Sequence, residues 1–259
     1  MKLEQLAVQL YTVRDSCQTA TDLAATARKL REIGFAAAEI AGLGPIPEDE
    51  VVRILRGEGL KICATHEPPA MILDSPEMSL GRVQRLGCAL AAYPWPAGID
   101  FSDAAQVESL CERLERAGAL FRAAGVTLCY HNHALEFMRF PGAHTTVLEH
   151  IFARTARRHL AAELDTYWVQ FGGGDPVAWC AKLAGRLGVL HLKDYVFTPE
   201  NKPVFGEIGR GTLDFPRIIA AAENSGCQWF VVEQDTCPGD PFESLRYSFE
   251  YIRQHLVET

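Results

Sequence analysis

Residues 104–133 read AAQVESLCERLERAGALFRAAGVTLCYHNH, a helical pattern that leads directly into a short apolar run. The apolar positions of its first part recur at about 3.6-residue spacing and share one helix face: Val107, Leu110, Cys111, Leu114 and Phe121. The run at residues 126–133 is too short for a typical helix and ends in polar residues. This stretch therefore predicts a helix over Ala104–Ala124 and then a buried strand with a polar end.

The same alternation extends along the whole chain. Eight short apolar runs are bounded by Gly, Pro or polar residues: Leu6–Val13, Ala36–Ala41, Leu60–His66, Cys88–Tyr93, Val126–His133, Leu160–Trp168, Leu187–Tyr195 and Trp229–Asp235. Helical patterns lie between and after them, at Thr21–Ile33, Glu48–Gly57, Glu77–Leu86, Ala104–Ala124, Thr145–Arg158, Pro176–Leu187, Phe215–Ser225 and Pro241–Leu256.

Eight strands alternating with helices predict a parallel sheet with crossover helices, and eight is the number that closes a barrel. An open doubly wound sheet is the main alternative, but the GxGxxG motif typical of that fold does not follow the first run. The length of 259 residues is also close to the typical length of a (β/α)8 barrel, which is about 250 residues. We therefore predict an α/β fold, one (β/α)8 TIM-barrel domain spanning residues 1–259.

Composition narrows the class of protein. The net charge of −8 argues against nucleic acid as a partner. No apolar run reaches the roughly 18 residues of a membrane span, and the first residues lack the pattern of a signal peptide, so we expect a cytoplasmic protein with no membrane partner. None of the eight cysteines forms a CxxC pair, and we interpret them as small buried hydrophobic residues.

Polar residues gather at the predicted strand ends, where the active sites of such barrels lie. They are Glu39, His66, Glu67, His131, Asn132, His133, Glu136, Glu163, Asp165, His191, Lys193, Asp194, Glu233, Gln234 and Asp235. Charges brought together at the mouth of a closed barrel repel one another unless something neutralises them, and a divalent cation does so. A ligand set of two Glu, one Asp and one His suits Mn²⁺, Mg²⁺, Co²⁺ or Fe²⁺, with Zn²⁺ as an alternative.

Such a site indicates a reaction. A cation that holds a carbonyl oxygen and the neighbouring hydroxyl acidifies the C–H bond between them. One carboxylate can then remove the proton and a second can return it, giving isomerisation or epimerisation through an enediolate. If a hydroxyl one carbon further along is expelled instead, the reaction is a dehydration.

Several segments resemble the sugar phosphate isomerase/epimerase family of xylose isomerase-like barrels. They are AVQLYTVR (Ala7–Arg14), VTLCYHNHALEF (Val126–Phe137), ELDTYWV (Glu163–Val169), HLKD (His191–Asp194), EIGRGTLDF (Glu207–Phe215) and VVEQD (Val231–Asp235). The family includes inosose dehydratase, ketose 3-epimerases, 3-dehydroshikimate dehydratase and, more distantly, endonuclease IV. The resemblance implies a metal-dependent isomerase or epimerase that acts on a keto-sugar or related polyol carbonyl.

The resemblance also implies a ligand set. Asp165, His191 and Glu233 match three of the family's four metal ligands. The fourth is a Glu in many relatives, at the position where His131 stands here. We expect Glu136, in the following loop, to take that place, with His131 as the alternative. Glu136 and Glu233 would then also form the pair of catalytic carboxylates.

We expect the substrate, a small-molecule sugar, to be bound by His66, His131, His133, Lys193 and Arg210. Tyr11, Trp95 and Trp168 are candidates for an apolar wall beside its ring. The resemblance further implies a homo-oligomer, because dimers and tetramers are usual in the family.

Three other functions are alternatives to an isomerase or epimerase. A lyase of the inosose or 3-keto-sugar dehydratase type would use the same ion and the same first proton abstraction. A DNA-repair enzyme like endonuclease IV needs more histidine ligands and a basic groove, against which the net charge of −8 argues. A non-catalytic binding module would not need Asp165, His191 and Glu233 intact.

Overall fold

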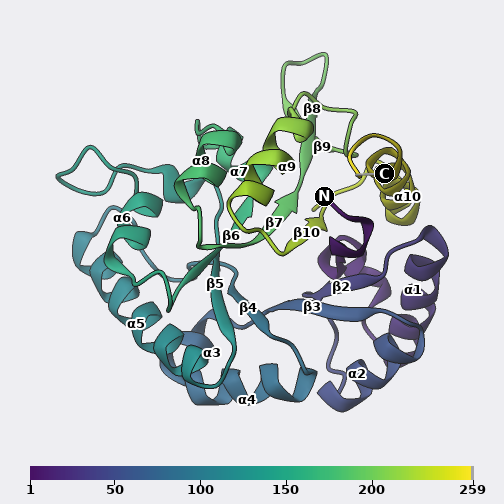
Figure 1. The fold of residues 1–259 in the computed structure, drawn as a ribbon, viewed down its shortest axis with the longest axis horizontal. Coiled ribbons are helices and arrows are strands. Elements are labelled where there is room, and N and C mark those ends of the chain that lie inside the picture. The colour runs from purple at the N-terminus through teal and green to yellow at the C-terminus, as the bar shows by residue number, and fades with distance from the viewer. Residues whose placement is uncertain (258–259) are drawn as a thin grey trace.

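The computed structural model describes residues 1–257 and contains a closed barrel of eight parallel strands in the order β1-β10-β7-β6-β5-β4-β3-β2 (Figure 1). The strands are β1 (Leu6–Gln9), β2 (Ala37–Ile40), β3 (Lys61–His66), β4 (Leu90–Tyr93), β5 (Thr127–His131), β6 (Ala161–Asp165), β7 (Leu187–Leu192) and β10 (Trp229–Val232). The predicted (β/α)8 barrel is confirmed.

Helices surround the barrel (Figure 1). They are α1 (Ala20–Ile33), α2 (Glu48–Gly57), α3 (Pro69–Asp74), α4 (Pro76–Leu86), α5 (Ala104–Ala123), α6 (Val147–Arg154), α7 (Thr166–Phe171), α8 (Pro176–Lys182), α9 (Phe215–Asn224) and α10 (Pro241–His255). Polar side chains cap the first turn of several helices. Asp103, for example, caps α5 by accepting hydrogen bonds from the N–H groups of Ala105 and Gln106. Within residues 1–257, no helix combines the length and apolarity needed to cross a membrane.

Several boundaries differ from the sequence-based expectations. The first strand ends at Gln9, and the chain then turns through a 3₁₀ helix, η2 (Leu10–Ser16). The sixth ends at Asp165 rather than Trp168, because the Asp165 side chain caps α7 by accepting from the Trp168 N–H at 2.8 Å. Helices α6 and α8 are shorter than predicted.

Three elements were not predicted at all. They are α3, α7 and an antiparallel hairpin formed by β8 (Asp194–Phe197) and β9 (Pro203–Gly206). Each is short, and each lies in a connection at the carboxyl end of a barrel strand. Elements of this length carry too few residues for a periodic hydrophobic pattern to develop.

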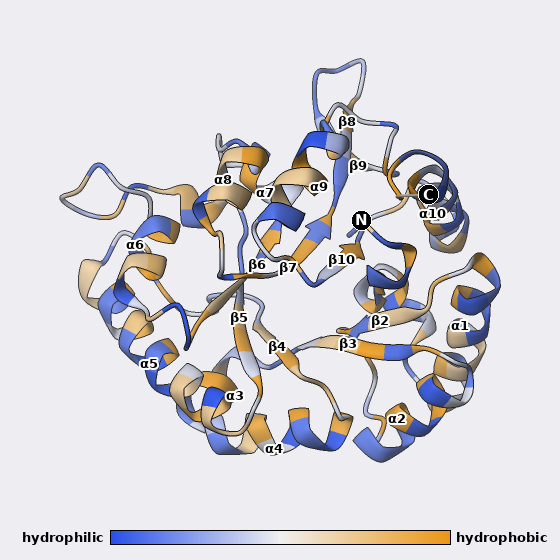
Figure 2. Cartoon of the chain, viewed as in Figure 1, coloured by the Kyte–Doolittle hydropathy of each residue, from blue (hydrophilic) through white to orange (hydrophobic). Residues whose placement is uncertain are grey.

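Apolar residues form two separate cores. The larger core lies between the strands and the helices, and the hydropathy colouring shows apolar residues along the strands and on helices around the barrel (Figure 2). The smaller core fills the barrel interior and consists mainly of small residues: Ala7, Ala37, Cys63, Ala64, Leu90, Ala92, Cys129, Ala161, Val189 and Val231. All eight cysteines, which lie within the described residues, are free, and seven of them are buried as expected while Cys237 is half-buried.

Polar side chains follow this small-residue layer toward the barrel mouth. Successive residues of a strand point to opposite faces, so residues two positions apart share the barrel interior. The register pairs Gln9 with Glu39, His131 with Glu163, and Asp165 with His191. The strands therefore carry a ring of polar groups on top of the small-residue layer, and this ring is the floor of the site.

Packing of α5 against the chain before β6 gives a test of the fold. A Cβ atom built at Gly118 would overlap the backbone carbonyl of His159, whereas one at Gly81 in α4 would find its nearest atom, Nη1 of Arg85, at 3.5 Å. Replacing a glycine inside a helix by alanine normally stabilises the folded protein by about 0.5–1 kcal/mol. We expect Gly81→Ala to raise the free energy of unfolding by this amount and Gly118→Ala to lower it by roughly 1–3 kcal/mol. Urea denaturation of both variants measures this, and equal stabilisation by both would contradict the packing described.

Candidate metal and substrate site

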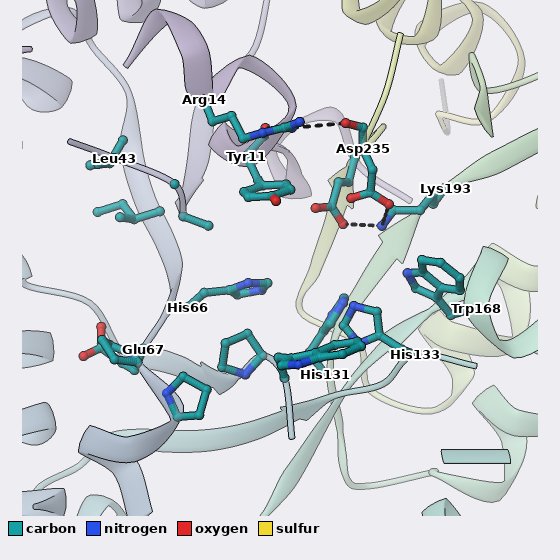
Figure 3. A pocket seen from close by; sticks show the side chains of 18 of the residues that line it. Tyr11, Arg14, Leu43, His66, Glu67, His131, His133, Trp168, Lys193 and Asp235 are labelled. Carbon is teal, nitrogen blue, oxygen red and sulfur yellow. Dashed lines mark hydrogen bonds and ion pairs between the residues drawn. The ribbon is translucent and has the colours of Figure 1, made fainter. Parts of the chain in front are cut away.

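A cavity of about 1040 Å³ opens at the carboxyl ends of the barrel strands (Figure 3). Five of the predicted site residues line it: His66, His131, His133, Lys193 and Glu233. Tyr11, Trp95 and Trp168, the candidates for an apolar wall, line it as well. The expected gathering of strand-end residues around one cavity is therefore observed.

Four side chains from neighbouring strands form what we call the outer ligand group, which consists of His131, Asp165, His191 and Glu233. Each offers one nitrogen or oxygen atom, and these atoms all lie within 4.8 Å of one another. Protein ligands sit about 2.0–2.6 Å from a divalent ion, so atoms on its opposite sides lie up to about 5 Å apart. All four residues are buried.

A second set, which we call the inner ligand group, consists of His66, His131, Glu163 and His191, and it meets the same distance limit. Nε2 of His66 lies 2.7 Å from Oε1 of Glu163, and Nδ1 of His131 lies 3.1 Å from the same oxygen. Since Glu163 precedes Asp165 by two residues in β6, this group lies deeper in the barrel. The two groups share His131 and His191.

The His191 ring lies between carboxylates on both sides. Its Nδ1 is 2.9 Å from Oε2 of Glu233, and its Nε2 is 2.7 Å from Oε2 of Glu39. Burial by itself would lower the pKa of His191, but the charges of Glu39 and Glu163 outweigh it and raise that pKa well above its ordinary value. A histidine that binds a metal through one nitrogen commonly donates from the other to a carboxylate, and the contact with Glu39 has this form.

The two histidines at the end of β5, His131 in the strand and His133 just after it, are neutral. Burial lowers the pKa of His131 to about 4, despite its contact with Glu163. Burial, reinforced by the nearby His131 and Lys193, lowers the pKa of His133 to about 2. A neutral imidazole offers a lone pair, so His131 is in the form that a metal ligand requires.

Lys193 is surrounded by three carboxylates. Its Nζ lies 3.2 Å from Oδ2 of Asp165, 2.8 Å from Oε2 of Glu233 and 3.0 Å from Oδ2 of Asp235. Burial opposes the charge of Lys193, but these three carboxylates raise its pKa above the ordinary value, so the ammonium stays protonated. The Lys193 charge also lowers the pKa of Glu233 far below its ordinary value, against the effect of burial, so Glu233 stays ionised.

The balance of charge around Lys193 indicates whether the outer ligand group could accept a cation. One ammonium faces three carboxylates there, and an uncompensated buried charge is costly. Oδ2 of Asp165 makes an ion pair with Lys193 but no hydrogen bond with any described residue, and Nδ1 of His131 makes none with proper geometry within residues 1–257, although Oε1 of Glu163 lies 3.1 Å away. These two ligand atoms without hydrogen bonds, the excess negative charge and two imidazoles make the outer ligand group a suitable site for a divalent ion.

Glu136 lies away from this group. It sits in a 3₁₀ turn, η3 (Leu135–Phe137), where its carboxylate accepts from the Tyr130 hydroxyl at 3.0 Å and from the His133 N–H at 2.8 Å. Among the described residues, it belongs to neither ligand group and does not line the cavity. The geometry therefore does not place Glu136 with Asp165, His191 and Glu233, and the alternative, His131, occupies that position.

Arg210 also lies elsewhere. The Gly209 and Gly211 N–H groups donate to Oδ2 of Asp194, which turns the loop backbone inward. The exposed Arg210 side chain instead pairs with Glu207 at 3.4 Å and stacks on the Tyr247 ring. Among the described residues that line the cavity, Arg210 is not present. The two glycines serve the geometry of the turn, because a Cβ at Gly211 would overlap the Asp194 carboxylate.

Three acidic residues received no role in the sequence analysis although they belong to the site. Asp235 lines the cavity beside Lys193, while Glu39 and Glu163 flank His191. A signal for Glu163 is present in the sequence, because Glu163 and Asp165 are two residues apart in one strand, and that spacing puts both carboxylates on one face. Glu233 and Asp235 have the same spacing but lie beyond the end of β10.

Comparison with known proteins shows which family the chain belongs to. The sequence model described as "Xylose isomerase-like TIM barrel" matches residues 27–255. The inosose dehydratase of Geobacillus thermodenitrificans is 29% identical over 163 residues, which cover 56% of this chain and 53% of that protein. The match thus spans about half the length of this curated relative.

Solved structures share the fold across nearly the whole chain. A sugar phosphate isomerase/epimerase from Parabacteroides distasonis superposes with a TM-score of 0.83 at 22% identity, covering 97% of this chain and 94% of that one. An L-ribulose 3-epimerase superposes with a TM-score of 0.74 at 16% identity, covering 98% and 94%. At these identities the likeness establishes the barrel architecture.

The burial of Glu136 predicts an unusual dependence of stability on pH. Burial raises its pKa from 4.5 to about 7 in the folded chain. Between these values the folded state keeps a proton that the unfolded state has lost, so stability falls as pH rises through this window and levels off above about pH 7. We expect Glu136→Gln to remove the loss, which is on the order of 3 kcal/mol, and to be most stabilising relative to wild type above pH 7.

Chemical denaturation between pH 5 and 8 measures this difference. Glu149→Gln is the matched control, because hydrogen bonding to Lys182 lowers the pKa of Glu149 and its charge stabilises the fold. That variant should be less stable than wild type at neutral pH. If the free energies of unfolding of wild type and Glu136→Gln differ by the same amount at every pH, the burial described is wrong.

Proposed function

Since the chain belongs to the xylose isomerase-like TIM barrel family, we propose that it is a metal-dependent isomerase or epimerase of keto-sugars. The outer ligand group carries this proposal. Two of its members, His131 and Glu233, line the cavity with Lys193 beside them, and the other two, Asp165 and His191, are buried next to them. Such a convergence of buried acidic and basic groups with shifted pKa values in a large cavity is the pattern of an active site.

His131, Asp165, His191 and Glu233 would hold the ion. Two carboxylates and two imidazoles suit Mn²⁺, Fe²⁺, Co²⁺ or Zn²⁺ better than Mg²⁺, which prefers oxygen ligands alone. Bound there, a divalent ion would polarise a carbonyl oxygen and lower the pKa of the neighbouring C–H bond.

The balance of charge favours the outer over the inner ligand group. In the inner group, the carboxylates of Glu39 and Glu163 face two histidines, His66 and His191, and each histidine has a raised pKa. Beside the outer group, the ammonium of Lys193 faces three carboxylates, and the one histidine among the described residues that also contacts them, His191 at Glu233, already faces Glu39 and Glu163. We therefore assign Glu39 and Glu163 to holding the His191 ring in place.

The chain's own residues can move the proton. Glu233 is ionised and lines the cavity, so it can remove a proton from the carbon beside a substrate carbonyl. Lys193 stays protonated and can donate a hydrogen bond to the oxygen that becomes negative, giving an enediolate. Asp235, whose pKa is raised by burial and by the Glu233 charge, can when protonated supply its own proton to the enediolate, while Glu233 keeps the proton that it removed.

Dehydration of a keto-sugar or inosose is the second candidate, and the match to an inosose dehydratase favours it. It shares the first step, removal of a proton by Glu233, and differs in the loss of a hydroxyl from the next carbon. The two reactions are separated by their products. Dehydration forms a conjugated carbonyl that absorbs in the ultraviolet, whereas epimerisation changes only the stereochemistry.

Metal content tests the assignment of the site. Asp165 belongs only to the outer ligand group and His66 only to the inner one, while Glu136 belongs to neither. We expect the loaded wild type to hold about one divalent ion per chain, and Asp165→Asn to lose at least about 10-fold in affinity. His66→Ala and Glu136→Gln should still bind it. Elemental analysis after dialysis gives the result; loss in His66→Ala with retention in Asp165→Asn would move the ion to the inner group.

Lys193 and Arg210 form a matched pair for activity, because the sequence analysis placed both against the substrate. We expect Lys193→Met to lower kcat by about 10²–10³-fold, since a donor to the developing negative charge is lost. Arg210→Met should stay near wild type, because its guanidinium is exposed and pairs with Glu207. Turnover of a panel of keto-sugars and inososes, with melting temperatures as a check on folding, measures this. Equal losses in both variants would contradict the site.

A further inference from the structure

The cavity has two chemically different sides. Over β5, β6, β7 and β10 it is polar, with Lys193, Glu233 and Asp235. Over β2, β3 and the start of α2, six apolar residues line it, which we call the apolar side: Ile40, Leu43, Ile46, Val51, Pro68 and Pro69. The three charged side chains beside them, Glu48, Glu67 and Arg82, are paired with one another. Figure 3 shows Leu43 across the cavity from Lys193 and Asp235, with His66 and His131 between them.

The cavity is larger than a sugar ring needs. Its volume of about 1040 Å³ reaches the upper end of the about 300–1,000 Å³ found for pockets that enclose drug-sized ligands. A ring that reacts at the outer ligand group would occupy the polar side. The apolar side would then be left to water, although it offers few hydrogen-bonding groups to hydroxyls.

Aromatic side chains border this space with much of their surface exposed. Tyr11 is 39% exposed and Trp95 is 46% exposed, and both line the cavity. Most large aromatic residues bury their rings, so two open rings on one rim indicate a surface that a ligand covers. On the polar side, Nε1 of Trp168 and Nδ1 of His133 are buried and make no hydrogen bond with any described residue.

Carboxylates dominate the charged groups of the cavity. Its described lining includes Glu48, Glu67, Glu233 and Asp235 on the acidic side and Arg14, His66, Arg82 and Lys193 on the basic side, and of these four basic groups only Arg14 lacks a carboxylate partner. Arg82 pairs with Glu67 and, at 3.5 Å, with Glu48, and Lys193 is surrounded by carboxylates.

Arg14 donates to the backbone oxygens of Tyr11 at 2.8 Å and Asp235 at 3.1 Å and stacks on the Tyr11 ring. The first turn of α2 adds three acidic residues, Glu48, Asp49 and Glu50, where an anion would otherwise be attracted to a helix N-terminus. The lining therefore disfavours a phosphorylated sugar.

We propose that the substrate is an uncharged keto-sugar that carries an apolar substituent, an aglycone of aryl type, and that this substituent packs on the apolar side. This inference rests on the proposed function, because it places the reacting ring over the outer ligand group. Trp168 and His133 then hydrogen-bond the ring hydroxyls, while Leu43, Tyr11 and Trp95 contact the aglycone. Specificity lies in the loops after β2, β3 and β4 rather than in the ligand groups.

Binding by isothermal titration calorimetry tests the proposal without turnover. The probes are matched methyl and phenyl glycosides of glucose, galactose and mannose, in both anomers, together with the corresponding hexose 6-phosphates. We expect at least one phenyl glycoside to bind ten or more times more tightly than its methyl partner, and the phosphates to bind no better than the free hexoses. A phosphate that binds more tightly than every glycoside, or no preference for phenyl in any pair, would overturn it.

A pair of variants locates the effect. Leu43→Asp places a charge on the apolar side at a half-buried loop position, and it should abolish the preference for phenyl glycosides. Val204→Asp is the control, because Val204 is an exposed hairpin residue outside the described cavity lining. Circular dichroism checks that both fold, and sedimentation checks whether the apolar side instead contacts a second copy. A change of assembly in Leu43→Asp with an unchanged phenyl preference would contradict the inference.

The two proposals fail separately. If the protein binds its divalent ion but shows no preference for phenyl glycosides, the inference about the aglycone is wrong and the proposed chemistry stands. If Asp165→Asn and wild type both bind no ion under any loading condition, the proposed function is wrong, whatever the glycosides show.

Discussion

The arrangement of the site depends on one constraint, the placement of three carboxylates around a single buried ammonium. Asp165 and Glu233 are buried and Asp235 is half-buried, and all three lie within 3.2 Å of Nζ of Lys193. Charges of one sign are stable away from water only when compensated, so Lys193 and the neighbouring imidazoles stabilise these carboxylates, and we propose that a divalent ion does so as well. The same imbalance keeps Glu233 ionised and Lys193 protonated, which are the states that proton abstraction needs.

The barrel supplies the rigidity that such a cluster requires. Small residues fill the interior below the site, so the long polar side chains of the strand ends can converge above them. Glu39 and Glu163, buried one level deeper, fix both the position and the charge of the His191 ring. Because the strands are paired in a closed ring, a shift of any one of them would displace ligands on its neighbours.

The loops above the floor have a different role. They divide the cavity into a polar side over the reactive groups and an apolar side over β2 and β3. This division is consistent with how barrels of one architecture serve different substrates, since the strand ends hold the chemistry and the loops select the molecule. The pairing of Arg82 with Glu48 and Glu67 belongs to the same selection, because it neutralises a cation that a phosphate would need.

The barrel and most of its helix boundaries could be predicted from the residues alone, because periodicity and capping residues such as Asp103 act locally. The grouping of Asp165, His191 and Glu233 could be predicted too, since parallel strands align their carboxyl ends. The folded chain was needed to show that Glu136 turns toward Tyr130 and that Arg210 faces solvent. Beyond a strand end, the direction of a side chain depends on the loop backbone and on partners distant in sequence, which no local pattern encodes.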